Sequence, residues 1–364
     1  MNALIKNPYR LFFLLGTLGL FAGLAVWVVF GFYSNEYYLG KMHAHYMIGI
    51  FLLCFVIGFL MTAIPRMSAS PGSSSKEFLF QLLPMIAAVI FGLFESMETY
   101  FFLSLVVALI VLFRFCVSRI IACPHMIPDV FPMVIMSLLS GLIGAIFFIF
   151  GQPEIGGKLF YLNMILGLCV GVGSKLIPMI LRLGCSNSYG AGEMWLIGIS
   201  LAGSCFIEAF WKESVGSFLR FMILIMVFFR YWRGHRFSGF NSSVAIGVRV
   251  SAFSIVLGTF GLWYFSDYRL ESLHLLYISG FGLLTLMVAS RVILSHGNYD
   301  LSLEFKNWFI KIPIALIILA ALTRMSAVFI EGGYERHLAY AALTFLVAGM
   351  MWAVYFLPKI VFKT

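Results

Sequence analysis

The sequence contains very little charge. Only 11% of its 364 residues are Asp, Glu, Lys or Arg, whereas a soluble globular domain has about 25%. Hydrophobic residues make up 62% of the chain, and they form continuous runs rather than alternating with polar residues. A strand barrel would need that alternation. The composition therefore predicts an all-α, polytopic integral membrane protein whose surroundings are a lipid bilayer.

Several sequence motifs of known chemistry are also lacking. The chain has no phosphate-binding G-x-x-x-x-G-K-[ST], no H-E-x-x-H and no nucleophile elbow. Its six cysteines are scattered, and no C-x-x-C occurs. The net charge of +9 comes from basic residues between apolar runs, which is orientation information and not a nucleic-acid footprint. We expect no nucleic-acid partner, and the sequence leaves open whether the chain is an enzyme.

Long apolar runs predict about twelve transmembrane helices. The connections between them are short, so we expect a single transmembrane domain over residues 1–364. The longest connection, Arg66 to Glu77, is rich in Ser, Gly and Pro and is typical of a flexible linker. The predicted spans are 11–31, 41–64, 78–94, 97–118, 130–150, 158–181, 193–211, 215–231, 244–265, 271–293, 308–330 and 336–357.

Lysine and arginine indicate the orientation of the spans, because cytoplasmic loops carry an excess of both. With the N-terminus in the cytoplasm, most basic residues fall in cytoplasmic segments, and both termini are cytoplasmic. The outer segments then hold only Lys41, Lys158, Lys212, Arg269 and Arg336.

A coarse internal repeat links the second, sixth and tenth spans. These spans end at Pro65, Pro178 and Arg291, which are spaced by 113 residues each time. A glycine stands seven residues before each proline, at Gly58 and Gly171. The spacing predicts three pseudo-repeats of four helices, with a chance coincidence as the alternative.

Three histidines lie at the outer ends of predicted spans. His43 and His45 open the second span, and His274 lies a few residues into the tenth. Imidazole is a common ligand of metals and haem iron, and an ionisable residue in a membrane segment is a functional-site hypothesis. Interfacial histidines that face headgroups or water are the simpler alternative.

Helix geometry restricts how these histidines can act. Residues two apart on a helix point about 200° apart, so His43 and His45 cannot both bind one iron from a regular helix. The simplest arrangement pairs one of them with His274 as the axial ligands of a b-type haem. A second redox or metal site could use the remaining histidine.

Other residues could complete a haem site. Arg324 lies inside the eleventh span, where a buried arginine needs an anionic partner. A haem propionate is one candidate, and Glu331 or Glu335 is the other. Glycines in the tenth span, Gly280 and Gly282, would let either a flat cofactor or a neighbouring helix approach closely.

These residues resemble the NnrS family over nearly the whole chain. Its first motif is similar to His43-Ala44-His45, Gly49 and Gly58-Phe59-Leu60-Met61-Thr62-Ala63-Ile64-Pro65. Its second is similar to Gly171-Val172-Gly173-Ser174-Lys175-Leu176-Ile177-Pro178. Its third is similar to His274, Gly280 and Gly282 followed by Arg291 and Leu294-Ser295-His296-Gly297, and Arg324 and Trp352 also match expected positions.

The resemblance implies a twelve-span protein of the bacterial inner membrane that contains haem and copper and is associated with nitric oxide and nitrosative stress. The chain departs from the family pattern at Tyr46, where an acid is expected, and over 243–250, which contains no histidine. The second departure weakens the expectation of copper. A more distant likeness is to the main subunit of haem-copper oxidases, although the histidines expected on helices 6 and 7 for its copper are missing.

We therefore expect a haem-binding protein of nitric-oxide tolerance, with His43, His45, His274 and Arg324 as candidate cofactor-binding residues and the three histidines as candidate metal ligands. Nitric oxide and an electron donor are the expected partners. The main alternative is a transporter or carrier for a metal, haem or small solute, which predicts a polar site at mid-membrane depth. A subunit without cofactor is a third alternative. The oligomeric state stays open.

Overall fold

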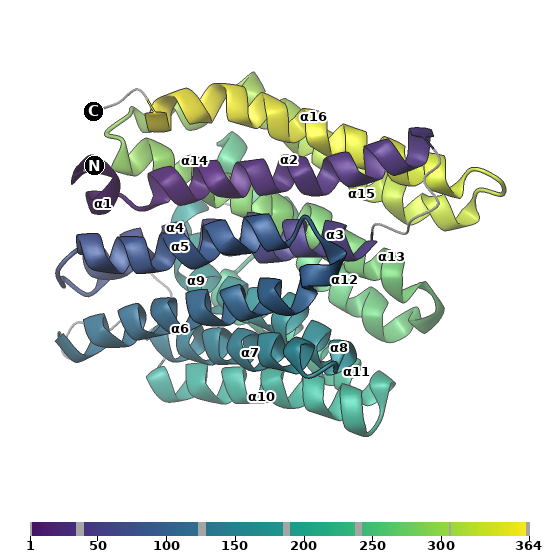
Figure 1. The fold of residues 1–364 in the computed structure, drawn as a ribbon, viewed down its shortest axis with the longest axis horizontal. Coiled ribbons are helices and arrows are strands. Elements are labelled where there is room, and N and C mark those ends of the chain that lie inside the picture. Colours follow the sequence, from purple (N-terminus) through teal and green to yellow (C-terminus); the bar gives the residue numbers. More distant parts are fainter. Residues whose placement is uncertain are drawn as a thin grey trace. The chain divides into compact units, whose positions relative to one another are not determined.

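A computed structural model describes residues 2–33, 40–122, 129–184, 190–236, 242–305 and 307–361. Within these ranges the chain is helical, and they contain no strand. Figure 1 shows long helices joined by short connections. The all-α fold class predicted from the composition is therefore confirmed.

In the described ranges, twelve long helices follow a short first one, α1 (Asn2–Lys6). Three of them contain a π-helical segment, labelled η, between two α-helical parts, and a fourth ends in one. The long helices are α2 (Tyr9–Tyr33), α3–η1–α4 (Gly40–Met67), α5 (Ser75–Phe91), α6 (Glu98–Ala122), α7 (Phe131–Ile149), α8–η4–α9 (Pro153–Ile180), α10 (Ala191–Phe210), α11–η5 (Glu213–Trp232), α12 (Ser243–Tyr264), α13–η7–α14 (Arg269–His296), α15 (Trp308–Ser326) and α16 (Tyr334–Val361).

Each predicted span coincides with one of these helices. Eleven of the helical segments are long and apolar enough to cross a membrane. The twelfth is α5, which has 17 residues and stands at the lower limit of about 17–25 for a membrane-spanning helix. A short 3₁₀ segment (Glu95–Met97) follows α5 and leads directly into α6. The chain is therefore a polytopic helical membrane protein.

The connection between α4 and α5 is held in place, so the prediction of a flexible linker is wrong. Arg119 of α6 donates hydrogen bonds to the carbonyl oxygens of Pro71 (2.9 Å) and Gly72 (3.0 Å). The same guanidinium forms two hydrogen bonds to the Glu77 carboxylate, of 2.9 and 2.8 Å. Glu77 and Ser74 also form a reciprocal capping box at the start of α5. One arginine thus fixes a loop whose composition is typical of flexible linkers.

The three helices that the sequence grouped as a repeat share an unusual start. Their π-helical segments are η1 (His45–Leu52), η4 (Gly157–Met164) and η7 (Leu276–Gly282). Only one other π-helical segment, η5 (Phe228–Trp232), lies within the described ranges. Because π-helices are rare and often mark functional sites, their recurrence at the same place in three spans supports the three-unit repeat.

Close packing of neighbouring helices recurs in the same three spans. A Cβ on Gly58 would lie 3.0 Å from Tyr9 Cα of α2, and one on Gly171 would lie 3.0 Å from Met133 Cβ of α7. A Cβ on Gly280 would lie 3.0 Å from Ile255 Cγ1 of α12. In each proposed repeat, a glycine of the second helix therefore admits the first helix.

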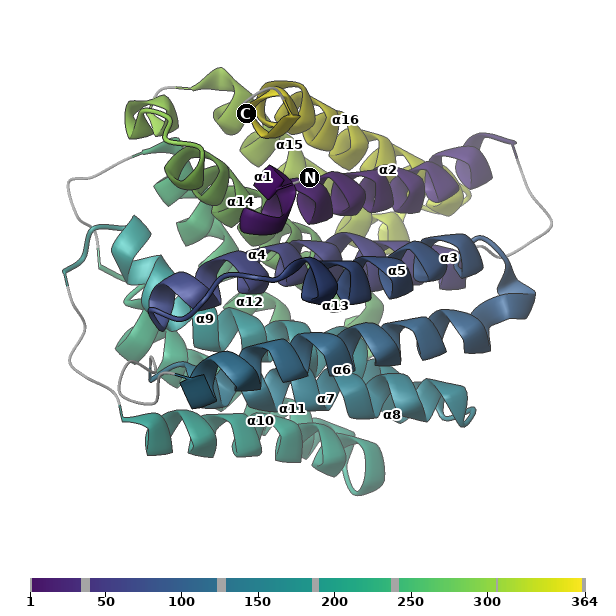
Figure 2. The ribbon, with the colours of Figure 1, turned by 60° about the vertical axis from the view of Figure 1, so that its left-hand side comes forward.

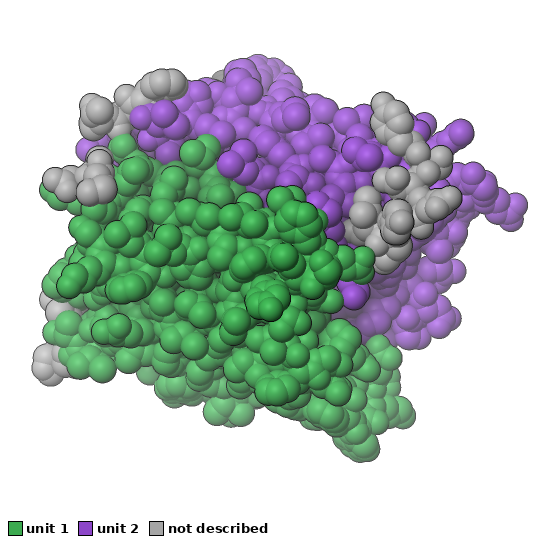
Figure 3. Space-filling view, viewed as in Figure 1, with its two compact units in different colours: residues 1–16, 48–175, 186–223 green, residues 17–47, 176–185, 224–364 purple. Residues whose placement is uncertain are grey.

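The chain divides into two compact units, coloured separately in Figure 3. Unit 1 contains residues 1–16, 48–175 and 186–223, and unit 2 contains residues 17–47, 176–185 and 224–364. Neither unit is continuous in sequence, and the single domain predicted for residues 1–364 stays a prediction.

Aromatic packing holds each unit together. In unit 1 the rings of Phe102 and Phe148 are stacked with centroids 4.1 Å apart, and Phe160 packs edge-on against Phe102. In unit 2, α15 and α16 lie side by side (Figures 1 and 2). Trp352 of α16 is fully buried there, and its Nε1 donates a 2.8 Å hydrogen bond to Ser290 Oγ. Buried aromatic rings thus fix the helices that carry the candidate site.

Candidate functional site

His43 is fixed by a contact to another helix. It lies in α3, and its Nδ1 donates a 2.8 Å hydrogen bond to the carbonyl oxygen of Gly23 in α2. The indole of Trp27, one turn further along α2, meets the imidazole edge-on at a centroid distance of 5.8 Å. Gly23 makes the approach possible, because a Cβ there would lie 2.9 Å from Met47 Sδ. The backbone of α2 therefore fixes the orientation of the His43 ring.

His274 is fixed within its own helix. It lies in α13, directly before η7, and its Nδ1 donates a 2.7 Å hydrogen bond to the carbonyl oxygen of Leu270 one turn earlier. Like His43, it is half-buried. A carbonyl can only accept, so in both residues Nδ1 carries the proton and Nε2 keeps its lone pair. Metal-binding histidines commonly show this arrangement.

Arg324 lies close to both histidines. It is in the last turn of α15 and is only 6% exposed. Its guanidinium is near enough for its charge to act on the imidazoles of both His43 and His274. Within unit 2, the structure thus brings together one member of the histidine pair, its predicted partner and the predicted arginine.

The anionic partner of Arg324 is a residue that the sequence reasoning missed. Its Nη1 lies 3.7 Å from Oε1 of Glu271, which is one turn before His274 in α13. The two acids considered as alternatives, Glu331 and Glu335, are exposed. The sequence contained one signal for Glu271, because it stands three residues before His274 and residues three apart share a helix face.

The guanidinium of Arg324 is only partly satisfied. Its Nη2 donates a 3.4 Å hydrogen bond to the hydroxyl of Tyr334. Its Nη1 is buried and makes no hydrogen bond to any described residue. Because buried polar groups are normally hydrogen-bonded, this arginine retains capacity to bind a second anionic group.

His45 is more deeply buried than His43 and His274. It is 5% exposed and is the first residue of η1. None of the contacts described for His43 or His274 involves it. The two glycines expected to admit a cofactor or a helix instead meet side chains of unit 2, since a Cβ on Gly282 would lie 3.0 Å from Phe345 Cζ and Gly280 faces Ile255. Both glycines therefore serve helix packing.

The donor set suits some cofactors better than others. Among the described residues, no group of three or more His, Cys, Asp or Glu side chains is arranged to hold a metal ion. A structural zinc site needs four protein ligands. Haem supplies four nitrogens itself and takes only one or two axial ligands from the protein. Two Nδ1-anchored imidazoles beside a partly unsatisfied arginine match the requirements of haem.

Comparison with known protein families identifies a relative of this chain. The family described as "NnrS protein" matches residues 3–362, which is nearly the whole chain. No curated protein matches the sequence.

Proposed function

The chain belongs to the NnrS family, and from this premise we propose that it is a haem-binding membrane protein that acts in nitric-oxide tolerance. In this proposal His43 and His274 are the axial ligands of a b-type haem, and Arg324 binds the anionic edge of the cofactor.

The observation that carries this proposal is the shared state of the two imidazoles. Both hold their Nδ1 proton against a backbone carbonyl, and the Nε2 of neither has a hydrogen-bond partner among the described residues. Nε2 is therefore the atom available to an iron in each case. The two rings come from different helices, α3 and α13, as two ligands that hold one cofactor between helices would.

Arg324 supports the proposal from a second direction. A haem propionate is an anion, and hydrogen bonds to charged groups are roughly twice as strong as neutral ones. The buried Nη1 of Arg324 has such a bond still to make. Oε1 of Glu271 lies 3.7 Å from the same Nη1, beyond hydrogen-bond distance, and its charge keeps the guanidinium near His274.

With both axial positions filled by histidine, haem supplies one-electron transfer more readily than direct capture of a diatomic gas. The protein's part is to hold the two rings in place through the Gly23 and Leu270 carbonyls. Trp27 packs against the His43 ring and keeps it from turning.

The proposal is tested by the reduced-minus-oxidised visible spectrum of protein purified from haem-sufficient cells. We expect a b-type spectrum in the wild type and its loss in His43→Ala and His274→Ala. His45→Ala should keep the spectrum. A wild-type protein without haem would refute the proposal, and loss of haem in His45→Ala but not in His43→Ala would refute the ligand assignment.

His337 provides a matched control. It also lies in unit 2 and donates from Nδ1 to a carbonyl one turn earlier, that of Gly333 at 3.0 Å. His337→Ala removes an equally anchored imidazole, and we expect it to retain haem. The physiological role is tested separately, by growth of a nitric-oxide-sensitive bacterial strain that expresses the wild type or His274→Ala. Only the wild type should restore growth under a nitric-oxide donor.

We propose copper only as a second occupant, with His45 as the remaining imidazole of the pair. Metal analysis of the same samples measures the copper content, and a copper content that is unchanged in His45→Ala would remove this part of the proposal.

We also propose a location in the bacterial inner membrane with both termini in the cytoplasm, on the basis of the Lys and Arg distribution. Reporter fusions at each terminus test that orientation.

A further inference from the structure

Unit 1 contains a buried charged cluster that lies outside the histidine site. It is formed by Lys158 of η4, Cys205 and Glu208 of α10, and Arg220 of α11. The side chains of Glu208 and Arg220 are fully buried, and that of Lys158 is 12% exposed. Ionisable side chains are rare in membrane spans and normally mark a pathway or a binding site.

The contacts of the cluster run from the surface to the interior. Glu154 is 79% exposed, and its Oε1 lies 2.7 Å from Lys158 Nζ. The same Nζ lies 4.0 Å from Oε1 of Glu208. Arg220 Nη2 donates hydrogen bonds to Glu208 Oε2 and, at 3.4 Å, to Cys205 Sγ.

In the deeper part of the cluster, positively charged side chains outnumber carboxylates. Lys158, with a side chain 12% exposed, and the fully buried Arg220 share the one fully buried carboxylate of the cluster, that of Glu208. The second carboxylate, Glu154, lies at the surface, where ion pairs are weak and exchange readily with solvent ions. Together the two cations and two carboxylates balance, so an anion bound beside Lys158 would take the place of the exposed Glu154 carboxylate.

Arg220 also has hydrogen-bonding capacity that the protein does not use. Its Nε and Nη1 are buried and make no hydrogen bond to any described residue. A guanidinium has five N–H donors, and here only Nη2 is engaged. The unused donors favour an anionic ligand.

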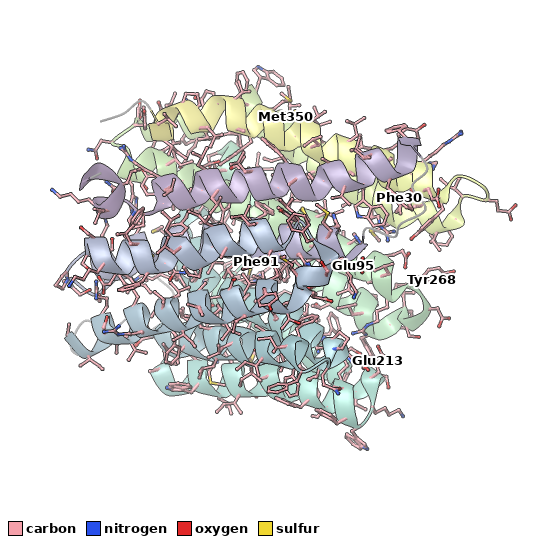
Figure 4. The ribbon with its side chains drawn as sticks, in the orientation of Figure 1. Phe30, Phe91, Glu95, Glu213, Tyr268 and Met350 are labelled. Carbon is pink, nitrogen blue, oxygen red and sulfur yellow. The ribbon has the colours of Figure 1, made fainter. Side chains whose placement is uncertain are left out.

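We propose that this cluster binds a small monovalent inorganic anion between Lys158 and Arg220. The ligand is small because the neighbouring side chains of Ile155, Leu159 and Cys205 are buried and packed together. Glu154 competes with the anion for Lys158, since both are negative and the ion pair of Glu154 is the exposed one. Figure 4 labels Glu213 and Glu95, which lie at the same end of unit 1. We predict that Glu95, and therefore this end of the unit, faces the outer compartment.

The test is equilibrium binding of radiolabelled chloride to the purified full-length protein in detergent, at fixed pH and with gluconate balancing the ionic strength. Wild type should bind chloride saturably. Lys158→Gln should weaken binding about tenfold or more, because it removes a charged hydrogen-bond donor. Glu154→Gln should tighten binding about two- to fivefold, because it removes the competing carboxylate.

Lys212→Gln is the matched control. It removes the same charge from an exposed lysine in the connection between α10 and α11, and it should leave the affinity unchanged. Neither Lys158 nor Glu154 belongs to the fully buried pair, so these variants should keep the fold. The proposal is overturned by absence of saturable chloride binding in the wild type, by wild-type affinity in Lys158→Gln, or by weaker binding in Glu154→Gln.

Discussion

The buried pair of Glu208 and Arg220 allows a sharp test of how the membrane interior stabilises charge. Removing one partner of a buried ion pair typically destabilises by about 3–5 kcal/mol, whereas replacing both by apolar residues is often neutral. In Arg220→Met, Glu208 keeps Lys158 at 4.0 Å, so the loss should be near the lower limit, about 3 kcal/mol. In Glu208→Leu two cations lose their shared carboxylate, and the loss should approach about 5 kcal/mol.

The double variant Glu208→Leu/Arg220→Met separates pairing from packing. It leaves Lys158 with Glu154 at 2.7 Å and removes both fully buried charges, so it should be more stable than either single variant. The assay is the free energy of unfolding from titration with sodium dodecyl sulfate in mixed micelles, followed by circular dichroism. If the losses of the two single variants simply add in the double variant, the pair does not act as a unit and the reasoning is wrong.

Two further predictions concern unit 1. Burial would raise the pKa of Glu77, but its hydrogen bonds from Arg119 and Ser74 outweigh this and hold the pKa below the ordinary 4.5. The ionised Glu77 carboxylate therefore stabilises the fold fully above pH 4.5, and this stabilisation is lost as the pH falls through the lowered pKa. In thermal unfolding, Glu77→Gln should melt at a lower temperature than the wild type at pH 6. At pH 3.5 the difference between the variant and the wild type should be smaller. Gly144→Ala should destabilise by about 1–3 kcal/mol, because a Cβ there would lie 2.5 Å from the Phe160 backbone nitrogen. Gly203→Ala, whose Cβ would have no atom within 4 Å, is the control and should change stability by less than about 1 kcal/mol.

The membrane spans were predictable because a bilayer demands continuous apolar runs of a fixed length. That requirement is local in sequence, so each run could be identified without knowledge of its neighbours. The loop from Arg66 to Glu77 shows the limit of the same approach. Its Ser, Gly and Pro content favours flexibility, but Arg119 holds it through contacts more than 40 positions away in the chain.

The candidate site was predictable in part. Shared depth at the outer interface was enough to group His43, His274 and Arg324 before any contact was known. The contact of His43 was not predictable, because it is made to the carbonyl of Gly23 in another helix. The sequence did not reveal Glu271 as the partner of Arg324, or Arg220 as the partner of Glu208. An ion pair between helices depends on which helix faces meet, and the apolar pattern of a membrane helix does not specify them.

The π-helical segments have a consequence for how this protein tolerates change in length. In an α-helix each residue turns the chain by about 100°, so losing one residue from a regular helix would misalign every side chain on one side of the loss. A π-helix carries surplus residues per turn. Deleting one residue from η7 would let the segment revert to a regular helix, with α14 still packed in its original register. The helix before η7 would keep its register as well, so His274 would still face Arg324, whereas the same deletion in a regular part of this span would turn the histidine away.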